Sequence, residues 1–162
     1  MKSDKLVSSK QKTESSKWTL GTPFPGFGWT GKCLVGNMGT NQAKTNELQQ
    51  RLNDFGARVT KVAKLLPKTE EGRYISKQIL RAGLAAAPNY AEARAAESRA
   101  DFVHKLRIAL KELNETRSWL EQIVANGLFS REKMGKIIAE NDELCWILAA
   151  SIETARASQN PI

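Results

Sequence analysis

Histidine, cysteine and long apolar runs are scarce in this chain of 162 residues. His104 is the single histidine, and the two cysteines, Cys33 and Cys145, lie far apart in segments of different composition. These residues supply neither a disulfide framework nor the ligand spacing of a zinc site, and such cysteine use is typical of a reducing cytosol. No stretch of 18 apolar residues is present, and the N-terminal lysines are not followed by the apolar segment of a secretory signal. We therefore expect a cytoplasmic protein without a metal or other cofactor.

The sequence also lacks the clustered groups that most catalytic sites need. A di-iron bundle requires two Glu-x-x-His motifs and two further glutamates, which a chain with one histidine cannot provide. Glu112 and Glu115 are spaced i,i+3, and a pair on the helix surface or a salt bridge with Arg81 or Arg107 explains them better than paired catalytic carboxylates. His104 falls between apolar positions and is expected to face solvent. The sequence predicts a protein that binds a partner and is not an enzyme.

Residues 1–45 differ in composition from the rest of the chain. They are rich in Ser, Lys, Thr, Gly and Pro, and they carry seven lysines against two acids. The segment 22–29 contains two prolines and two glycines, which a helix interior does not tolerate. We predict a disordered basic tail over residues 1–45, with Met38 as an alternative start of the chain. Its aromatic side chains could stack on bases, dock on the folded part or have no role, and a solvated tail without a role is the commonest case.

Four segments after residue 45 repeat apolar residues at the 4-3 spacing of helices in left-handed bundles. The first runs from Asn46, which forms a capping box with Gln49, to Leu66, where Pro67 ends it. The other three cover about residues 70–96, 98–127 and 130–157, and the short connections force antiparallel neighbours. We predict an all-α fold, an antiparallel up-down-up-down four-helix bundle over residues 46–158. The predicted core positions of the first and third helices are Leu48, Leu52, Phe55, Val59, Val62, Leu66, Phe102, Leu106, Ala109, Leu113, Thr116, Leu120 and Ile123.

The second predicted helix contains a proline in its interior. Pro88 removes the hydrogen bond to the carbonyl of Leu84, so we predict a kink there, with a break into two shorter helices as the alternative. Asn89 and Glu92 follow one turn apart. We expect a structural role for this polar pair, either exposed or bonding carbonyls left free by Pro88 and a neighbouring helix.

The formal net charge of +8 is unevenly distributed. Residues 46–117 carry 14 basic and nine acidic side chains, whereas residues 118–162 carry four basic and six acidic ones. Basic residues recur every four positions along the second helix, and the first helix adds more. A solvated face with intrahelical ion pairs is the ordinary explanation, but a stripe with few acids favours contact with phosphates. The candidate nucleic-acid-binding residues are Arg58, Lys61, Arg73, Lys77 and Arg81.

The central part of the chain resembles a known family of helical bundles. The resemblance rests on Gln78 to Arg81, Asn89-Tyr90-Ala91-Glu92-Ala93, Ser98, Asp101-Phe102, Leu106, Ile108-Ala109, Glu112, Glu115 and Trp119-Leu120. With these features, residues 46–157 resemble the four-helix-bundle proteins encoded in 23S rRNA intervening sequences. Pro88 departs from the small polar residue usual in that family.

This resemblance implies a cytosolic bacterial bundle that assembles as a homopentamer. It extends to the accessory variability protein of diversity-generating retroelements, whose basic pentameric barrel binds nucleic acid and a reverse transcriptase. Two functions are therefore predicted. The favoured one is an oligomeric bundle that binds nucleic acid, RNA above all, through the five basic residues and with help from the tail. The alternative is a scaffold that docks a protein partner, such as a reverse transcriptase, without nucleic acid.

Overall fold

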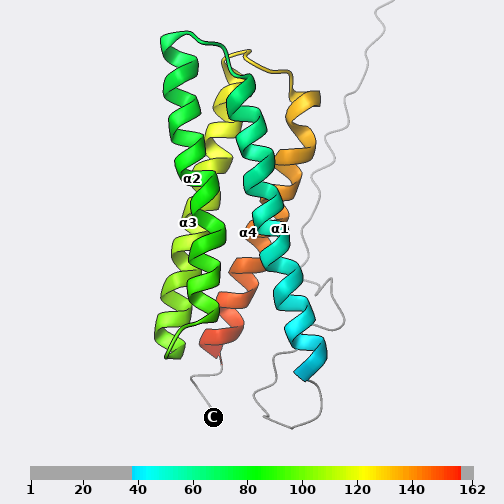
Figure 1. Cartoon of the computed structure of the whole chain (residues 1–162), viewed down its shortest axis with the longest axis vertical. Coiled ribbons are helices and arrows are strands. Elements are labelled where there is room, and N and C mark those ends of the chain that lie inside the picture. Colours follow the sequence, from blue (N-terminus) through cyan, green and yellow to red (C-terminus); the bar gives the residue numbers. More distant parts are fainter. Residues whose placement is uncertain (1–37, 158–162) are drawn as a thin grey trace, which may run out of the picture. The chain divides into compact units, whose positions relative to one another are not determined.

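The computed structural model describes the backbone of residues 38–157 and the side chains of residues 42–157. Four helices follow one another: α1 (Met38–Leu65), α2 (Glu70–Arg94), α3 (Arg99–Ala125) and α4 (Arg131–Ala157). They run alternately up and down and are joined by short turns (Figure 1). The predicted antiparallel four-helix bundle is confirmed. Of the tail predicted over residues 1–45, residues 38–45 are helical, so the predicted disorder is wrong there. Residues 1–37 lie outside the described residues, and the predictions made for them and their aromatics stay predictions.

Helix α1 begins eight residues earlier than predicted, at Met38 instead of Asn46. Asn46 is therefore not an N-cap. Its side-chain oxygen accepts hydrogen bonds from Gln42 on the preceding turn (3.2 Å) and from Arg94 of α2 (2.7 Å). The extension was missed because Ala43 is the one apolar side chain between Met38 and Leu48 in the sequence. The helix therefore continues there without an amphipathic pattern.

Helix α2 runs without interruption through Pro88, so the predicted alternative of two shorter helices is wrong. Thr69 caps its first turn, where the Thr69 hydroxyl accepts from the Gly72 amide (3.2 Å). The Pro88 side chain is exposed, so its ring is accommodated on the solvent side of the helix. The kink predicted at this residue stays a prediction.

Helix α3 and helix α4 begin and end within a few residues of the positions expected from the sequence. Ser98 caps α3 by accepting from the Asp101 amide (3.1 Å). The helix ends in a Schellman motif, in which the Leu128 amide donates to the Ile123 carbonyl (3.0 Å) and Gly127 has a positive φ of 68°. Ser130 in turn caps α4 through the Lys133 amide (3.4 Å). These local signals fix both ends of the α3–α4 turn.

Apolar side chains from all four helices form one core. Leu52, Leu106 and Leu148 are fully buried and Phe55 is 1% exposed. Two predicted core positions are only partly buried, Val62 and Phe102, while the next residue in each helix is buried instead. A straight helix has 3.6 residues per turn and drifts away from a strict heptad, which explains this shift by one position.

The helices do not pack equally against one another. Helices α2 and α3 make the most extensive contact, α1–α2 and α3–α4 follow, and α1 and α4 touch least. The α1–α2 contact is close at Gly83, where an added Cβ would lie 2.6 Å from Cγ1 of Val59. Between α2 and α3, the rings of Tyr74 and Trp119 meet edge to face at 5.9 Å. None of the helices described is long and apolar enough to cross a membrane.

Candidate nucleic-acid interface

The basic stripe predicted on α2 lies on the surface. Arg73, Lys77 and Arg81 are all exposed, as their four-residue spacing on the side opposite the core requires. Among the described residues, only Arg81 of these three has an ion-pair partner, Glu115 of α3. This pair confirms the interpretation of Glu115 as a salt-bridge partner, and it removes Arg81 from the charges available to a ligand.

The two candidate residues on α1, Arg58 and Lys61, are three positions apart and are neighbours on the helix surface. Lys61 is exposed. Arg58 is partly buried and follows Arg51 by seven residues, two turns on, so both lie on the same side of α1. Arg51 faces α4, where its guanidinium bonds Glu140 (3.0 Å) and Glu143 (3.1 Å). Arg58 therefore lies toward the α1–α4 edge, away from the stripe on α2.

Two of the five candidate residues share a concave site. Arg73 and Lys77 line a pocket between the end of α1 and the start of α2, together with Lys68 of the connecting turn. Lys68 was not among the five residues predicted for the interface. The sequence counts Lys68 among the further basic residues near the stripe, but only the folded turn shows that it lines a pocket with Arg73 and Lys77.

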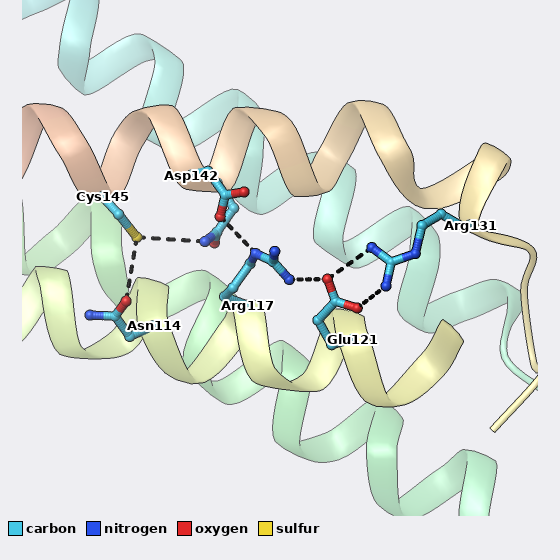
Figure 2. A network of polar contacts seen from close by, with 7 residues as sticks. Asn114, Arg117, Glu121, Arg131, Asp142 and Cys145 are labelled. Carbon is cyan, nitrogen blue, oxygen red and sulfur yellow. Dashed lines mark hydrogen bonds and ion pairs between the residues drawn. The ribbon is translucent and has the colours of Figure 1, made fainter. Parts of the chain in front are cut away.

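Basic side chains are neutralised at the opposite side of the bundle. Between α3 and α4, Arg117 bonds Asp142 (2.6 Å) and also pairs with Glu121, which in turn pairs with Arg131 (Figure 2). Burial opposes the charge of Arg117, but its hydrogen bonds with Asp142 and Glu121 raise its pKa. Hydrogen bonds from Arg131 and Arg117 lower the pKa of Glu121. These charges stabilise one another, and a ligand would have to compete for them.

Asn89 and Glu92 do not bond each other. The Asn89 amide donates to the carbonyl of Ala85 (2.8 Å), one turn back and next to the carbonyl of Leu84 that Pro88 leaves without its helical donor. Glu92 is exposed and pairs with Lys105 of α3 (2.6 Å), a hydrogen bond that raises the pKa of Lys105. Both contacts are structural in kind. A neighbouring helix does reach this segment, but through a residue not predicted, Gln49 of α1, which donates to the Ala87 carbonyl (3.1 Å).

The described residues offer little for catalysis. His104 is exposed, as predicted. Burial, and then the nearby Asp142 carboxylate, raise the pKa of the Cys145 thiol to about 11. A thiol with that pKa is protonated at neutral pH and is a poor nucleophile. Within residues 42–157, no three His, Cys, Asp or Glu side chains gather closely enough to hold a metal ion.

Comparison with known proteins identifies the relatives of this bundle. A family model described as 23S rRNA-intervening sequence protein matches residues 44–150, from the second turn of α1 to the second half of α4. The chain belongs to this family. The resemblance found in the sequence is thereby confirmed for the family at large, and the family's description names no class of enzyme.

A solved structure extends this finding. A protein of unknown function from the S23 ribosomal protein family of Bacteroides thetaiotaomicron is 37% identical, with a TM-score of 0.64. The match covers 68% of this chain and 98% of that protein. No curated protein matches the chain. The likeness to the accessory protein of retroelements stays a prediction.

Proposed function

We propose that this 23S rRNA-intervening sequence protein is a cytoplasmic, non-enzymatic bundle that binds nucleic acid, RNA above all, through the α1–α2 side. One observation carries the proposal. Residues 58–81 contain seven basic and two acidic side chains. Of these seven, only Arg81 forms an ion pair within the part of the chain that the structure describes. The other six are Arg58, Lys61, Lys64, Lys68, Arg73 and Lys77.

Unpaired surface cations are what phosphate binding requires. A cation that already pairs with a carboxylate contributes little to phosphate binding, because the carboxylate compensates its charge. Free lysines and arginines instead neutralise phosphates and displace the counterions bound to the nucleic acid. The release of these counterions makes the affinity depend on the salt concentration. The family's description, which refers to 23S rRNA, agrees with this ligand class but does not name a binding activity.

The test is the salt dependence of RNA binding. Each contact with a single-stranded phosphate contributes about −0.7 to the slope of log affinity against log salt. Five contacts, one for each of these six cations except Arg58 at the α1–α4 edge, therefore predict a slope of about −3.5, or about a 100-fold loss of affinity between 50 and 200 mM salt. We expect the triple variant Lys61→Gln, Arg73→Gln, Lys77→Gln to reduce that slope by about 2. Fluorescence anisotropy with a labelled RNA measures both.

A matched control separates a site from bulk charge. The triple variant Lys111→Gln, Lys133→Gln, Lys136→Gln removes the same number of charges from exposed positions on α3 and α4. The proposal requires this variant to bind RNA with nearly the native slope. Equal losses in both variants would mean non-specific attraction, and absence of binding by the native protein at low salt would end the proposal.

A second observation favours self-association and, with it, the alternative of a protein-docking module. Trp146 on α4 is 64% exposed. Gly135, Ala139 and Ala150 are also exposed and lie on the same face, because they are spaced from it by eleven, seven and four residues. An exposed tryptophan amid small residues is typical of interface positions, where a second backbone can approach closely.

We propose that this α4 face contacts a second copy of the chain in a homo-oligomer, a pentamer being the favoured number. Analytical ultracentrifugation tests it: Trp146→Glu should shift the native assembly toward the mass of one chain, whereas Tyr74→Glu, on exposed α2 surface, should not. A native protein that is monomeric would instead leave the face to a different protein, such as a reverse transcriptase. In that case a copurified partner should dissociate on Trp146→Glu with little dependence on salt.

A further inference from the structure

The pocket between α1 and α2 is lined by apolar and basic residues. Its volume is about 180 Å³. The pocket combines an apolar floor, three cations and no acidic residue. Its lining consists of Ala63, Leu66, Pro67, Lys68, Gly72, Arg73, Ser76 and Lys77. Apolar walls have a low dielectric constant and concentrate the field of the cations in the space that they enclose.

The three cations of the pocket have no competing carboxylate. Within residues 42–157, no ion pair involves Lys68, Arg73 or Lys77. Glu70 and Glu71 belong to the neighbouring first turn of α2, but both are exposed and neither lines the pocket. The positive end of the α2 dipole adds to the cationic field at the same place. The site is therefore favourable for an anion.

The backbone around the pocket is held in place by specific contacts. An added Cβ at Gly72 would lie 2.2 Å from the carbonyl oxygen of Pro67, so a glycine is required for the turn to close. The Ser76 hydroxyl donates to the Ala63 carbonyl (3.2 Å) and ties α2 to α1. Since these contacts exist without a ligand, little ordering of the backbone is needed when one binds.

The size of the pocket limits what can enter. Pockets for whole cofactors or drug-sized ligands measure about 300–1,000 Å³. The volume of this pocket, about 180 Å³, is smaller than that. It is several times larger than the roughly 30 Å³ that one water molecule occupies. One tetrahedral anion fits, and a complete nucleotide does not.

We propose that this pocket binds a phosphate group, held by Arg73 and Lys77 from α2 and by Lys68 from the turn. Arginine presents a planar set of donors that matches phosphate oxygens, and the two lysines supply point charges. A phosphomonoester fits best, because it carries nearly two negative charges at neutral pH and is attached through a single oxygen. Its source is either the end of an RNA strand or a free phosphate.

This inference rests in part on the proposed function, since Arg73 and Lys77 belong to both sites, so two measurements are needed. The first compares one single-stranded RNA with a 5′-phosphate and with a 5′-hydroxyl, binding to the full chain at constant salt. We expect the phosphorylated strand to bind about tenfold more tightly, the effect of one charge-assisted contact set. In the double variant Arg73→Gln, Lys77→Gln the preference should fall below about twofold.

The second measurement uses inorganic phosphate alone and is independent of RNA. Amide resonances of Gly72, Arg73 and Lys77 in the full chain should shift saturably with phosphate, and not with chloride at equal ionic strength. The shifts should be lost in the double variant Arg73→Gln, Lys77→Gln. They should persist in Lys133→Gln, Lys136→Gln, which removes the same charge from α4. Circular dichroism of both variants confirms that they remain folded.

The outcomes separate the two proposals and the two phosphate sources. A 5′-phosphate preference that depends on Arg73 and Lys77 identifies an RNA end as the ligand. Saturable phosphate binding without that preference identifies a free phosphate. RNA binding with neither effect overturns the pocket and leaves the proposed function standing. Phosphate binding without any RNA binding at low salt supports the pocket and rejects the proposed function.

Discussion

Asn141 is the polar residue most at odds with its surroundings. It lies on the core side of α4 and is fully buried. Its amide nitrogen approaches the sulfur of Cys145 at 3.5 Å, and its oxygen has no hydrogen-bond partner among the described residues. A buried acceptor without a partner costs about 1–3 kcal/mol. Buried amides in helical bundles are best known for fixing register at the expense of stability.

We therefore expect Asn141→Leu to raise the free energy of unfolding by about 1–3 kcal/mol, because it removes the uncompensated acceptor and keeps a similar side-chain volume. Urea denaturation followed by circular dichroism measures the change. Leu144→Ala, at a fully buried apolar position one turn away, should instead destabilise by about 2–5 kcal/mol. A loss of stability in Asn141→Leu would show that the amide oxygen is satisfied, for instance by water.

Two different kinds of contact join the pairs of helices. Helices α1 and α2 approach through small residues, with Gly83 against the buried side chain of Val59. Helices α3 and α4 are instead linked at their polar edge by the network of Arg117, Asp142, Glu121 and Arg131 (Figure 2). The first contact depends on the volume of the side chains and the second on their charge. A change of side-chain size should therefore affect the first, and a change of charge or pH the second.

Gly83→Ala tests the close approach of α1 and α2. The new methyl would lie 2.6 Å from Val59 Cγ1 and 3.1 Å from its Cβ, and Val59 is fully buried. Overpacking of this kind costs about 1–3 kcal/mol, which exceeds the gain of about 0.5–1 kcal/mol from replacing glycine in a helix. We expect a net loss in thermal denaturation. Gly135→Ala on α4, where the added methyl meets nothing within 4 Å in one chain, should stabilise the single chain instead.

Glu121→Gln tests the network between α3 and α4. Hydrogen bonds from Arg131 and Arg117 lower the pKa of Glu121 in the folded state. The unfolded chain therefore binds the proton more readily, and the stability from this group is present above the unfolded pKa and is lost as pH falls through the folded pKa. We expect the variant to lose less stability than the native protein between about pH 6 and pH 3. Glu132→Gln, at an exposed position without an ion pair in the described chain, controls for net charge.

Across the whole bundle, packing and charge are both asymmetric. The α2–α3 pair is the most extensively packed and the α1–α4 seam the least. Six cations without an ion pair among the described residues lie on α1, α2 and the turn between them, whereas Arg51, Arg117 and Arg131 are held by carboxylates across or beside α4. The charges proposed to bind a ligand thus include residues of α2, one of the two helices in the most extensive contact.

This asymmetry predicts how the native state opens. Because α1 and α4 each have one extensive neighbour and α2 and α3 each have two, partial opening should begin by separation of α1 from α4. We expect core amides of α2 and α3 to exchange with solvent more slowly than those of α1 and α4 in native-state hydrogen exchange. Slowest exchange in α4 would contradict this, or would indicate protection by a second copy on the Trp146 face.

Much of the fold could be predicted from the chain, because the signals are local. Ser98, Gly127 and Ser130 end or begin helices through bonds to residues three to five positions away, and such bonds follow from sequence spacing. The start of α1 was missed because the sequence between Met38 and Leu48 lacks the apolar period of the later turns. The five predicted cations were located on the correct helices, but the sequence did not show which of them form ion pairs with carboxylates of other helices.

The sequence by itself determined four amphipathic helices, their order and their antiparallel packing, since a 4-3 apolar period and short turns allow few other arrangements. The tertiary structure alone decided which charges remain free and where they converge. Arg81 and Glu115 are 34 positions apart and Arg51 and Glu140 are 89 apart, and Lys68 joins Arg73 and Lys77 only when the turn closes. Ion pairing and concavity depend on distances across helices, and no local pattern encodes those distances.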